Sequence, residues 1–152
     1  MQLRKGQLVL SPSDLTNYLA CRHLAALEFD AARGKRTKPH TREALTQLIA
    51  EKGELHEQRY LEYLKAQGCG IVEVELPHHA NAFEEAHATT VAAMRAGAEV
   101  IYQATFVRAG WGGRADFVIR VDEPSDLGHW SYEPWDTKLG SNVTSVALVS
   151  GT

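Results

Sequence analysis

Residues 100–121 read VIYQATFVRAGWGGRADFVIRV, and the fold prediction depends most on this pattern. Its first part, residues 100–107, is an apolar run rich in β-branched and aromatic residues, which predicts a buried β-strand. Residues 108–113 contain three glycines and predict a turn. Residues 114–121 return to a strand pattern, so the whole stretch predicts a β-hairpin.

The segments around this hairpin alternate between helical and strand patterns. Ser11-Pro12-Ser13-Asp14 is a helix-start signal, because serine caps a helix and proline suits its first turn. Helices are predicted over residues 11–32, 41–67 and 80–96, and further strands over 71–76 and 130–139. This order predicts an α/β or α+β domain with antiparallel strands at one sheet edge.

The composition is that of an ordinary globular protein, with 44% hydrophobic and 23% charged residues. The length predicts one domain over residues 1–152, helical at 11–67, sheet-forming at 70–139 and without a clear pattern at 140–152. No apolar run approaches the roughly 18 residues of a membrane span, and the N-terminus lacks the apolar stretch of a secretory signal. Two cysteines without a CxxC pattern favour a reducing compartment. A cytoplasmic protein with no membrane partner is expected.

Charge is unevenly distributed along the chain, although the net charge is only −3. Residues 1–42 carry eight Lys and Arg against three acids, a net of +5, whereas the remainder carries eight against sixteen, a net of −8. A basic part beside an acidic part fits phosphate contact on one side and cation binding on the other. An uneven solvated surface explains the same distribution.

Two carboxylates and a lysine occupy the last two predicted strands. Asp136 and Lys138 are two residues apart and therefore share one strand face. Asp116 lies near the start of the preceding strand, so strand pairing would bring the three groups to one sheet end. Two carboxylates suit Mg²⁺ or Mn²⁺, and such a cation activates water and stabilises charge on a scissile phosphate. Lys138 would then hold that water or a phosphate oxygen.

Four segments of the chain resemble the RecB-like nucleases of the PD-(D/E)XK superfamily. They are SPSDLTNYLACRHL at 11–24, EKGELHE at 51–57, WGGRADF at 111–117 and WSYEPWDTKL at 130–139. The likeness is greatest to uncharacterised RecB-like nucleases in which the phrases Asp-Leu-Gly-x-Trp-Ser-Tyr-Glu and Asp-Thr-Lys-Leu recur. The resemblance implies a restriction-endonuclease-like core, with a central mixed sheet flanked by helices.

The resemblance also implies residue roles and a function. His56, Asp116 and Asp136 would bind Mg²⁺ or Mn²⁺ together with the Thr137 carbonyl, and Lys138 would orient or activate the attacking water. The activity would be hydrolysis of phosphodiester bonds in DNA, in repair, recombination or defence. DNA is the expected partner, with a helicase or another repair or defence protein as a further one.

The chain departs from the family pattern in three places. Gly53 and His56 are three residues apart rather than four. Residues 141–152 match nothing of the helix that follows the lysine in relatives, so the chain is interpreted as C-terminally truncated. Cys21 corresponds to an iron–sulfur ligand of relatives, but a cluster needs four thiolates and is expected only in a full-length relative.

Several assignments stay open at this stage. A bare Asp-x-Lys is also compatible with an ion pair on a solvent-facing strand, and His56 with an ordinary surface histidine. Arg114 is interpreted as a phosphate contact or the partner of an acid. Glu54 and Glu57 either assist cation binding through water or are simply solvated. The loop residues that contact either DNA or only solvent are Lys35, Arg36 and Lys38. Tyr102 and Gln103 are assigned to sheet packing.

Three functional hypotheses follow. The first is a metal-dependent DNA nuclease domain. The second is a catalytically silent nucleic-acid-binding or accessory fragment of such a nuclease. The third is an unstable gene fragment, in which the loss of a covering helix exposes apolar surface and a sheet edge.

Overall fold

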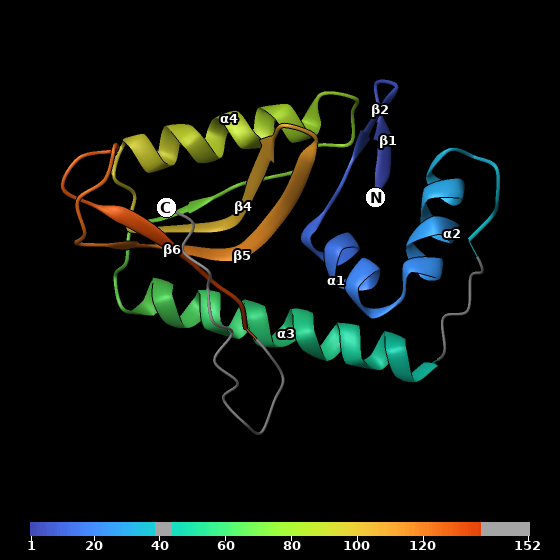
Figure 1. The fold of residues 1–152 in the computed structure, drawn as a ribbon. Helices are drawn as coiled ribbons and strands as arrows, with labels where there is room; N and C mark the ends of the chain where they lie inside the picture. The colour runs from blue at the N-terminus through green and yellow to red at the C-terminus, as the bar shows by residue number, and fades with distance from the viewer. Residues whose placement is uncertain (39–43, 138–152) are drawn as a thin grey trace.

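A four-stranded mixed sheet lies between two helices in the computed structural model, which describes residues 1–38 and 44–137 (Figure 1). The strands lie in the order β3 (Ile71–Glu73), β4 (Val100–Arg108), β5 (Trp111–Val121) and β6 (Ser131–Trp135). β3 and β4 are parallel, whereas β4–β5 and β5–β6 are antiparallel. This mixed sheet with helices confirms the predicted α/β class.

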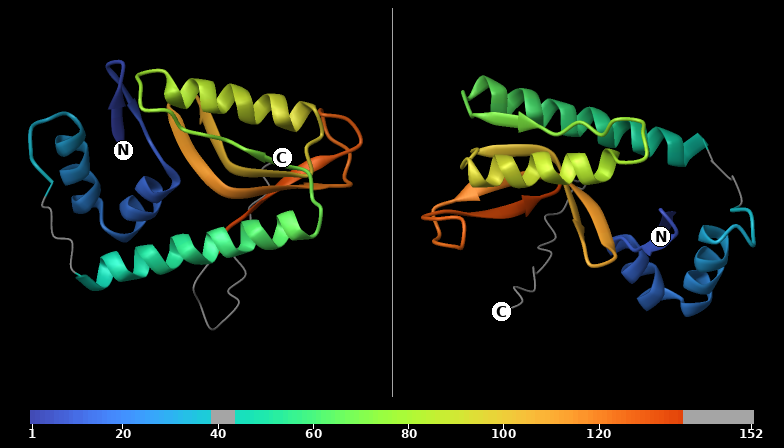
Figure 2. Two further views of the ribbon diagram at one scale, coloured as in Figure 1. Left: turned by 180° about the vertical axis from the view of Figure 1, so that it is seen from behind. Right: turned by 90° about the horizontal axis from the view of Figure 1, so that it is seen from above.

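The helices α3 (Ala44–Ala66) and α4 (Ala82–Arg95) cover opposite faces of the sheet (Figures 1 and 2). Each face has its own group of buried side chains. The α4-side cluster consists of Val74, Ala86, Ala93, Ile101, Ala104 and Val118. The α3-side cluster consists of Leu61, Leu64, Val100 and Phe117. Consecutive residues of a strand belong to different clusters because strand side chains alternate between faces.

The hairpin between β4 and β5 closes through a two-residue turn, Ala109-Gly110, with φ angles of 50° and 82°. This geometry matches the right-handed twist of the paired strands. The predicted turn over 108–113 is therefore too long, since Gly112 and Gly113 already pair within β5. A Cβ atom on Gly112 would meet Val9 at 3.0 Å, so this glycine permits close approach of the N-terminal segment.

The N-terminal segment differs from its prediction. Residues 1–10 contain an unpredicted hairpin of β1 (Gln2–Arg4) and β2 (Gln7–Val9). The helix predicted over 11–32 is two helices, α1 (Pro12–Ala20) and α2 (Arg22–Ala32). The break falls at Cys21, which has an extended backbone and ends α1 while it begins α2.

The N-terminal hairpin is bonded to the tip of the long β4–β5 hairpin. The Leu10 amide donates to the Gly110 carbonyl at 2.9 Å, and the Gly112 amide donates to the Leu10 carbonyl at 2.8 Å. These two bonds connect the first ten residues to the sheet that carries the candidate site.

The last strand is shorter than predicted. β6 ends at Trp135, so Asp136 and Thr137 follow the strand instead of lying within it. Lys138 and the predicted tail lie outside the described residues. Within residues 1–38 and 44–137, no helix has the length and apolarity needed to cross a membrane.

Candidate active site

Three polar residues form a row across β4, β5 and the end of β6. The pairs Tyr102–Phe117 and Ala104–Ala115 flank Gln103 and Asp116, which therefore stand opposite each other. Phe117 also pairs with Trp135 of β6, so Asp136 comes next to Asp116 one residue further on. The strand register thus brings together the two carboxylates that the sequence predicted to converge.

The regular alternation of side chains between the two faces of β4 is interrupted at Gln103. Ile101 and Ala104 both belong to the α4-side cluster, whereas a regular strand would place residues three apart on opposite faces. The interruption is Gln103, whose φ angle of 55° is in the left-handed region. As a result, Tyr102 and Gln103 line the same pocket beside α3.

Glu57 is the side chain that α3 contributes. Leu61 and Leu64, one and two turns further along, are buried in the α3-side cluster, and this places Glu57 on the helix face toward the sheet. Its carboxylate accepts hydrogen bonds from the side-chain amide of Gln103 and the hydroxyl of Tyr102. His56 is exposed on the same helix.

Several acids lie close together in the site, and the pKa of Asp116 is raised as a result. Burial, the charge of Glu57 and the hydrogen bond and charge of Asp136 together raise the pKa of Asp116 from 3.8 to about 6. The backbone N–H of Thr137 donates to this carboxyl and opposes the rise. Shared protons and raised pKa values are typical of carboxylates held close together.

Tyr102 stays protonated beside these acids. Burial, its hydrogen bond to Glu57 and the Glu57 charge raise the pKa of Tyr102 to about 12, and the charge of Asp116 adds to the effect. A hydrogen bond with Gln103 opposes the rise. The phenol is therefore a hydrogen-bond donor to Glu57 at neutral pH.

The donor chemistry of these residues fits a hard divalent cation. Glu57, Asp116 and Asp136 supply only oxygen donors, and Mg²⁺ is commonly held by one or two carboxylates with several waters. Among the described residues, no three His, Cys, Asp or Glu side chains already converge as a complete ligand set. The fit therefore rests on the pair Asp116–Asp136, with Glu57 nearby, and with water filling the remaining positions.

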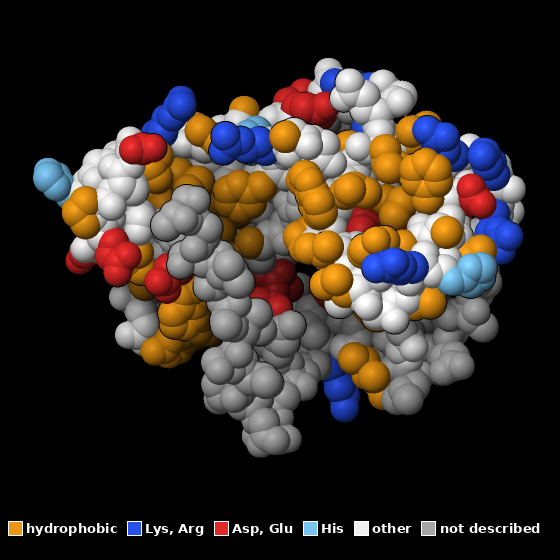
Figure 3. All heavy atoms as spheres, in the orientation of Figure 1, with side chains coloured by type: hydrophobic (Ala, Val, Ile, Leu, Met, Phe, Trp, Pro, Cys, Tyr) orange, Lys and Arg blue, Asp and Glu red, His pale blue; other side chains and the backbone are white. Residues whose placement is uncertain are grey.

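An open pocket of about 320 Å³ lies next to the row, lined by Glu54, Glu57, Gln58, Tyr102 and Gln103. In the space-filling view, Asp and Glu side chains lie in a hollow near the centre of the face shown (Figure 3). The pocket gives solvent access to Glu57 and Gln103, so water and a cation can reach this side of the site.

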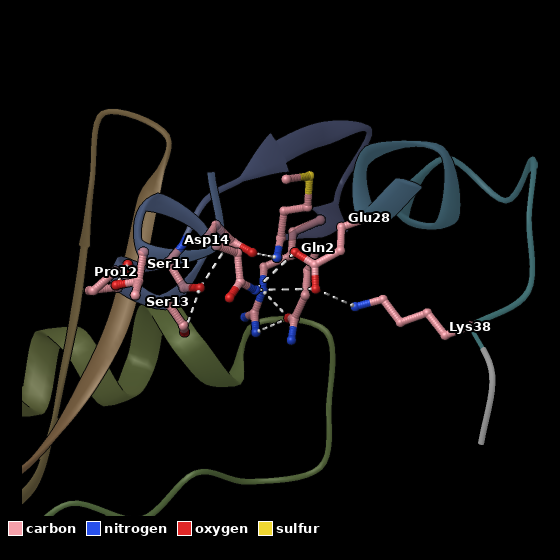
Figure 4. Close-up of polar contacts among 11 residues, drawn as sticks. Gln2, Ser11, Pro12, Ser13, Asp14, Glu28 and Lys38 are labelled. Atoms are coloured by element: carbon pink, nitrogen blue, oxygen red, sulfur yellow. Dashed lines mark hydrogen bonds and ion pairs between the residues drawn. The ribbon is translucent and has the colours of Figure 1, made fainter. Parts of the chain in front are cut away.

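Three of the predicted DNA-contacting residues follow α2, and the fourth, Arg114, lies on β5. Lys35 and Lys38 lie 4.0 Å and 3.8 Å from the carboxylates of Asp30 and Glu28, and the second pair is drawn in Figure 4. Arg36 is exposed. Arg114 is also exposed, and its guanidinium donates to the Val74 backbone carbonyl at 3.4 Å. Arg114 therefore has a backbone partner in place of the acid considered from sequence.

Cys21 has a structural role at the start of α2. Its sulfur accepts the Leu24 amide at 3.5 Å, which caps the helix. The side chain is exposed, and the other cysteine, Cys69, is half-buried near the far end of α3. The iron–sulfur assignment of Cys21 stays a prediction for a longer relative.

Sequence reasoning missed the importance of Glu57 and Gln103. The sequence gives Glu57 the same two interpretations as Glu54, and the strand pattern around Gln103 predicts packing. A polar residue in an apolar strand was the available signal for Gln103, since a buried amide needs a partner.

Comparison with protein-family models, curated proteins and solved structures finds no match to this chain.

Proposed function

We propose that the chain is a metal-dependent nuclease domain that hydrolyses phosphodiester bonds in DNA, with a restriction-endonuclease-like core of the RecB-like PD-(D/E)XK type. The observation that carries the proposal is the contact between Asp116 and Asp136, with the charge of Glu57 acting on the same carboxyl. Three neighbouring acids repel one another unless protons or a cation neutralise them. The mixed sheet with helices on both faces supports the proposed core.

The proposed roles divide the site between binding and orientation. Asp116 and Asp136 would hold the cation, with Glu57 as a third carboxylate, directly or through water. The Thr137 carbonyl and His56 stay predicted ligands. When bound, the cation would neutralise charge on the scissile phosphate and lower the pKa of a bound water.

The protein's own groups would prepare the site for that cation. Tyr102 and Gln103 donate hydrogen bonds to Glu57 and so orient its carboxylate. The Thr137 backbone N–H donates to the Asp116 carboxyl in the same way. Lys138 is predicted to hold the attacking water, and it lies outside the described residues.

The test is a cleavage assay with single- and double-stranded DNA in Mg²⁺ or Mn²⁺. Asp116→Asn and Asp136→Asn are expected to abolish cleavage, because each removes a negative ligand while it preserves side-chain shape. Asp122→Asn is the matched control, since Asp122 is exposed in the loop after the same strand. Cleavage by Asp116→Asn at the parent rate would refute the proposed site, as would an equal loss in the control.

A nucleic-acid-binding module without catalysis is the second candidate. The exposed cations Arg33, Lys35 and Arg36 after α2 favour it, because phosphate contacts come mainly from Lys and Arg and need no acid cluster. DNA binding that falls steeply with salt, without cleavage in either metal, would favour this candidate over the nuclease.

A further inference from the structure

Gln103 is the only residue of β4 with a left-handed backbone. Non-glycine residues rarely adopt this conformation, and those that do so inside an element cluster at functional sites. Ala109 has a similar φ angle of 50°, but it lies in a hairpin turn that requires such an angle. No turn accounts for the backbone of Gln103.

The conformation has a direct consequence for the side chain. In a regular strand, Gln103 would point to the face opposite Tyr102, which is the face covered by α4. With φ at 55°, its amide instead reaches the Glu57 carboxylate on α3. The residue also stands directly across from Asp116, where the ladder between β4 and β5 lacks a regular pair.

We infer that Gln103 is a positioning residue that holds Glu57 toward the Asp116–Asp136 pair, and that its strained backbone is retained for this purpose. The inference rests on the function proposed above, with Glu57 as the third carboxylate of the cation site. The side-chain amide of Gln103 is not ionisable, so it acts only by donating its hydrogen bond to Glu57.

The measurement is the affinity for Mn²⁺ alone, determined by calorimetric titration, together with thermal unfolding without metal. Gln103→Ala and Gln103→Gly both remove the amide, and each is expected to weaken Mn²⁺ binding about 10–100-fold, as for other groups that orient a metal ligand. Gln103→Gly is expected to unfold about 2–4 °C above Gln103→Ala, because glycine accepts the left-handed backbone without strain.

Ala109→Gly is the matched control for backbone strain. This substitution removes the backbone strain of a similar φ angle in the turn and is expected to leave Mn²⁺ affinity unchanged. A double substitution tests whether Gln103 acts through Glu57. Glu57→Ala with Gln103→Ala should bind Mn²⁺ no more weakly than Glu57→Ala alone, since the second change has no carboxylate left to orient.

The outcomes separate this inference from the proposed function. Parent affinity in both Gln103 variants, while Asp116→Asn loses Mn²⁺ binding, would overturn the role of Gln103 and leave the cation site intact. Additive losses in the double variant would also overturn it. If the parent binds no Mn²⁺, or Asp116→Asn binds it equally well, the proposed cation site fails and the role of Gln103 fails with it.

Discussion

Replacing Asp116 by Asn should stabilise the metal-free protein at alkaline pH. The pKa of this carboxyl rises from 3.8 in its unperturbed state to about 6 in the fold, a difference of about 2 units. At about 1.4 kcal/mol per unit, this corresponds to about 3 kcal/mol. The carboxyl keeps some solvent contact, and screening reduces the value to about 1–2 kcal/mol.

The sign follows from proton binding. Between pH 4 and pH 6, the folded protein holds the Asp116 proton more tightly than the unfolded chain, so the free energy of unfolding falls as pH rises. The loss of stability that results from ionising Asp116 is complete above about pH 7 and absent below about pH 4. Asparagine never ionises, so Asp116→Asn should exceed the parent by about 1–2 kcal/mol at pH 8 and by little at pH 4.

Urea unfolding at pH 4, 6 and 8 in the presence of a chelator measures this difference, with Asp122→Asn as the exposed control. A gain that is the same at pH 4 and pH 8 would refute the electrostatic explanation, and so would a loss at pH 8. Addition of Mg²⁺ should stabilise the parent and not the variant, because the cation replaces the proton in neutralising the acids.

Two further substitutions test the packing that supports the site. Thr90→Val should lower the free energy of unfolding by about 1–3 kcal/mol, because the buried hydroxyl accepts a hydrogen bond from the Thr105 amide, which would lose its partner. Thr89→Val, on the exposed side of α4, should lower it much less. Equal urea midpoints for the two variants would contradict this prediction. Gly97→Ala should lower stability by about 1–2 kcal/mol, since φ is 74° and a side chain other than glycine is strained there. Gly68→Ala has a similar φ angle and should cost about as much, and an unchanged thermal midpoint in Gly97→Ala would contradict the backbone explanation.

The helices and strands with strong periodic patterns were predictable. The patterns over 41–67, 80–96 and 100–107 correspond to α3, α4 and β4 within a few residues. The N-terminal hairpin was not predicted, because its strands have three residues each and too few alternations for a periodic signal. The division of α1 from α2 depends on a sulfur cap at Cys21, a residue type that seldom serves as a helix cap.

The candidate site was predictable in part. Asp116 and Asp136 come together because strand register follows from the hairpin pattern. The side chain that α3 turns toward the sheet could not be predicted from sequence, since one residue corresponds to a rotation of about 100° around a helix and only docking of α3 places Glu57 on that face. The hydrogen bond from Gln103 to Glu57 was not predicted, because it depends on a left-handed backbone that a non-glycine residue rarely adopts.

The contact between α3 and the sheet also has a kinetic consequence. Gln103 and Glu57 are 46 residues apart, whereas β4 and β5 close locally through a two-residue turn. Local hairpins form before distant contacts, so we expect α3 to dock late in folding. Docking of α3 after the rate-limiting barrier would make the repulsion between Glu57 and Asp116 accelerate unfolding and leave the folding rate unchanged. The lifetime of the native state, more than its rate of formation, would therefore depend on pH and on bound cation.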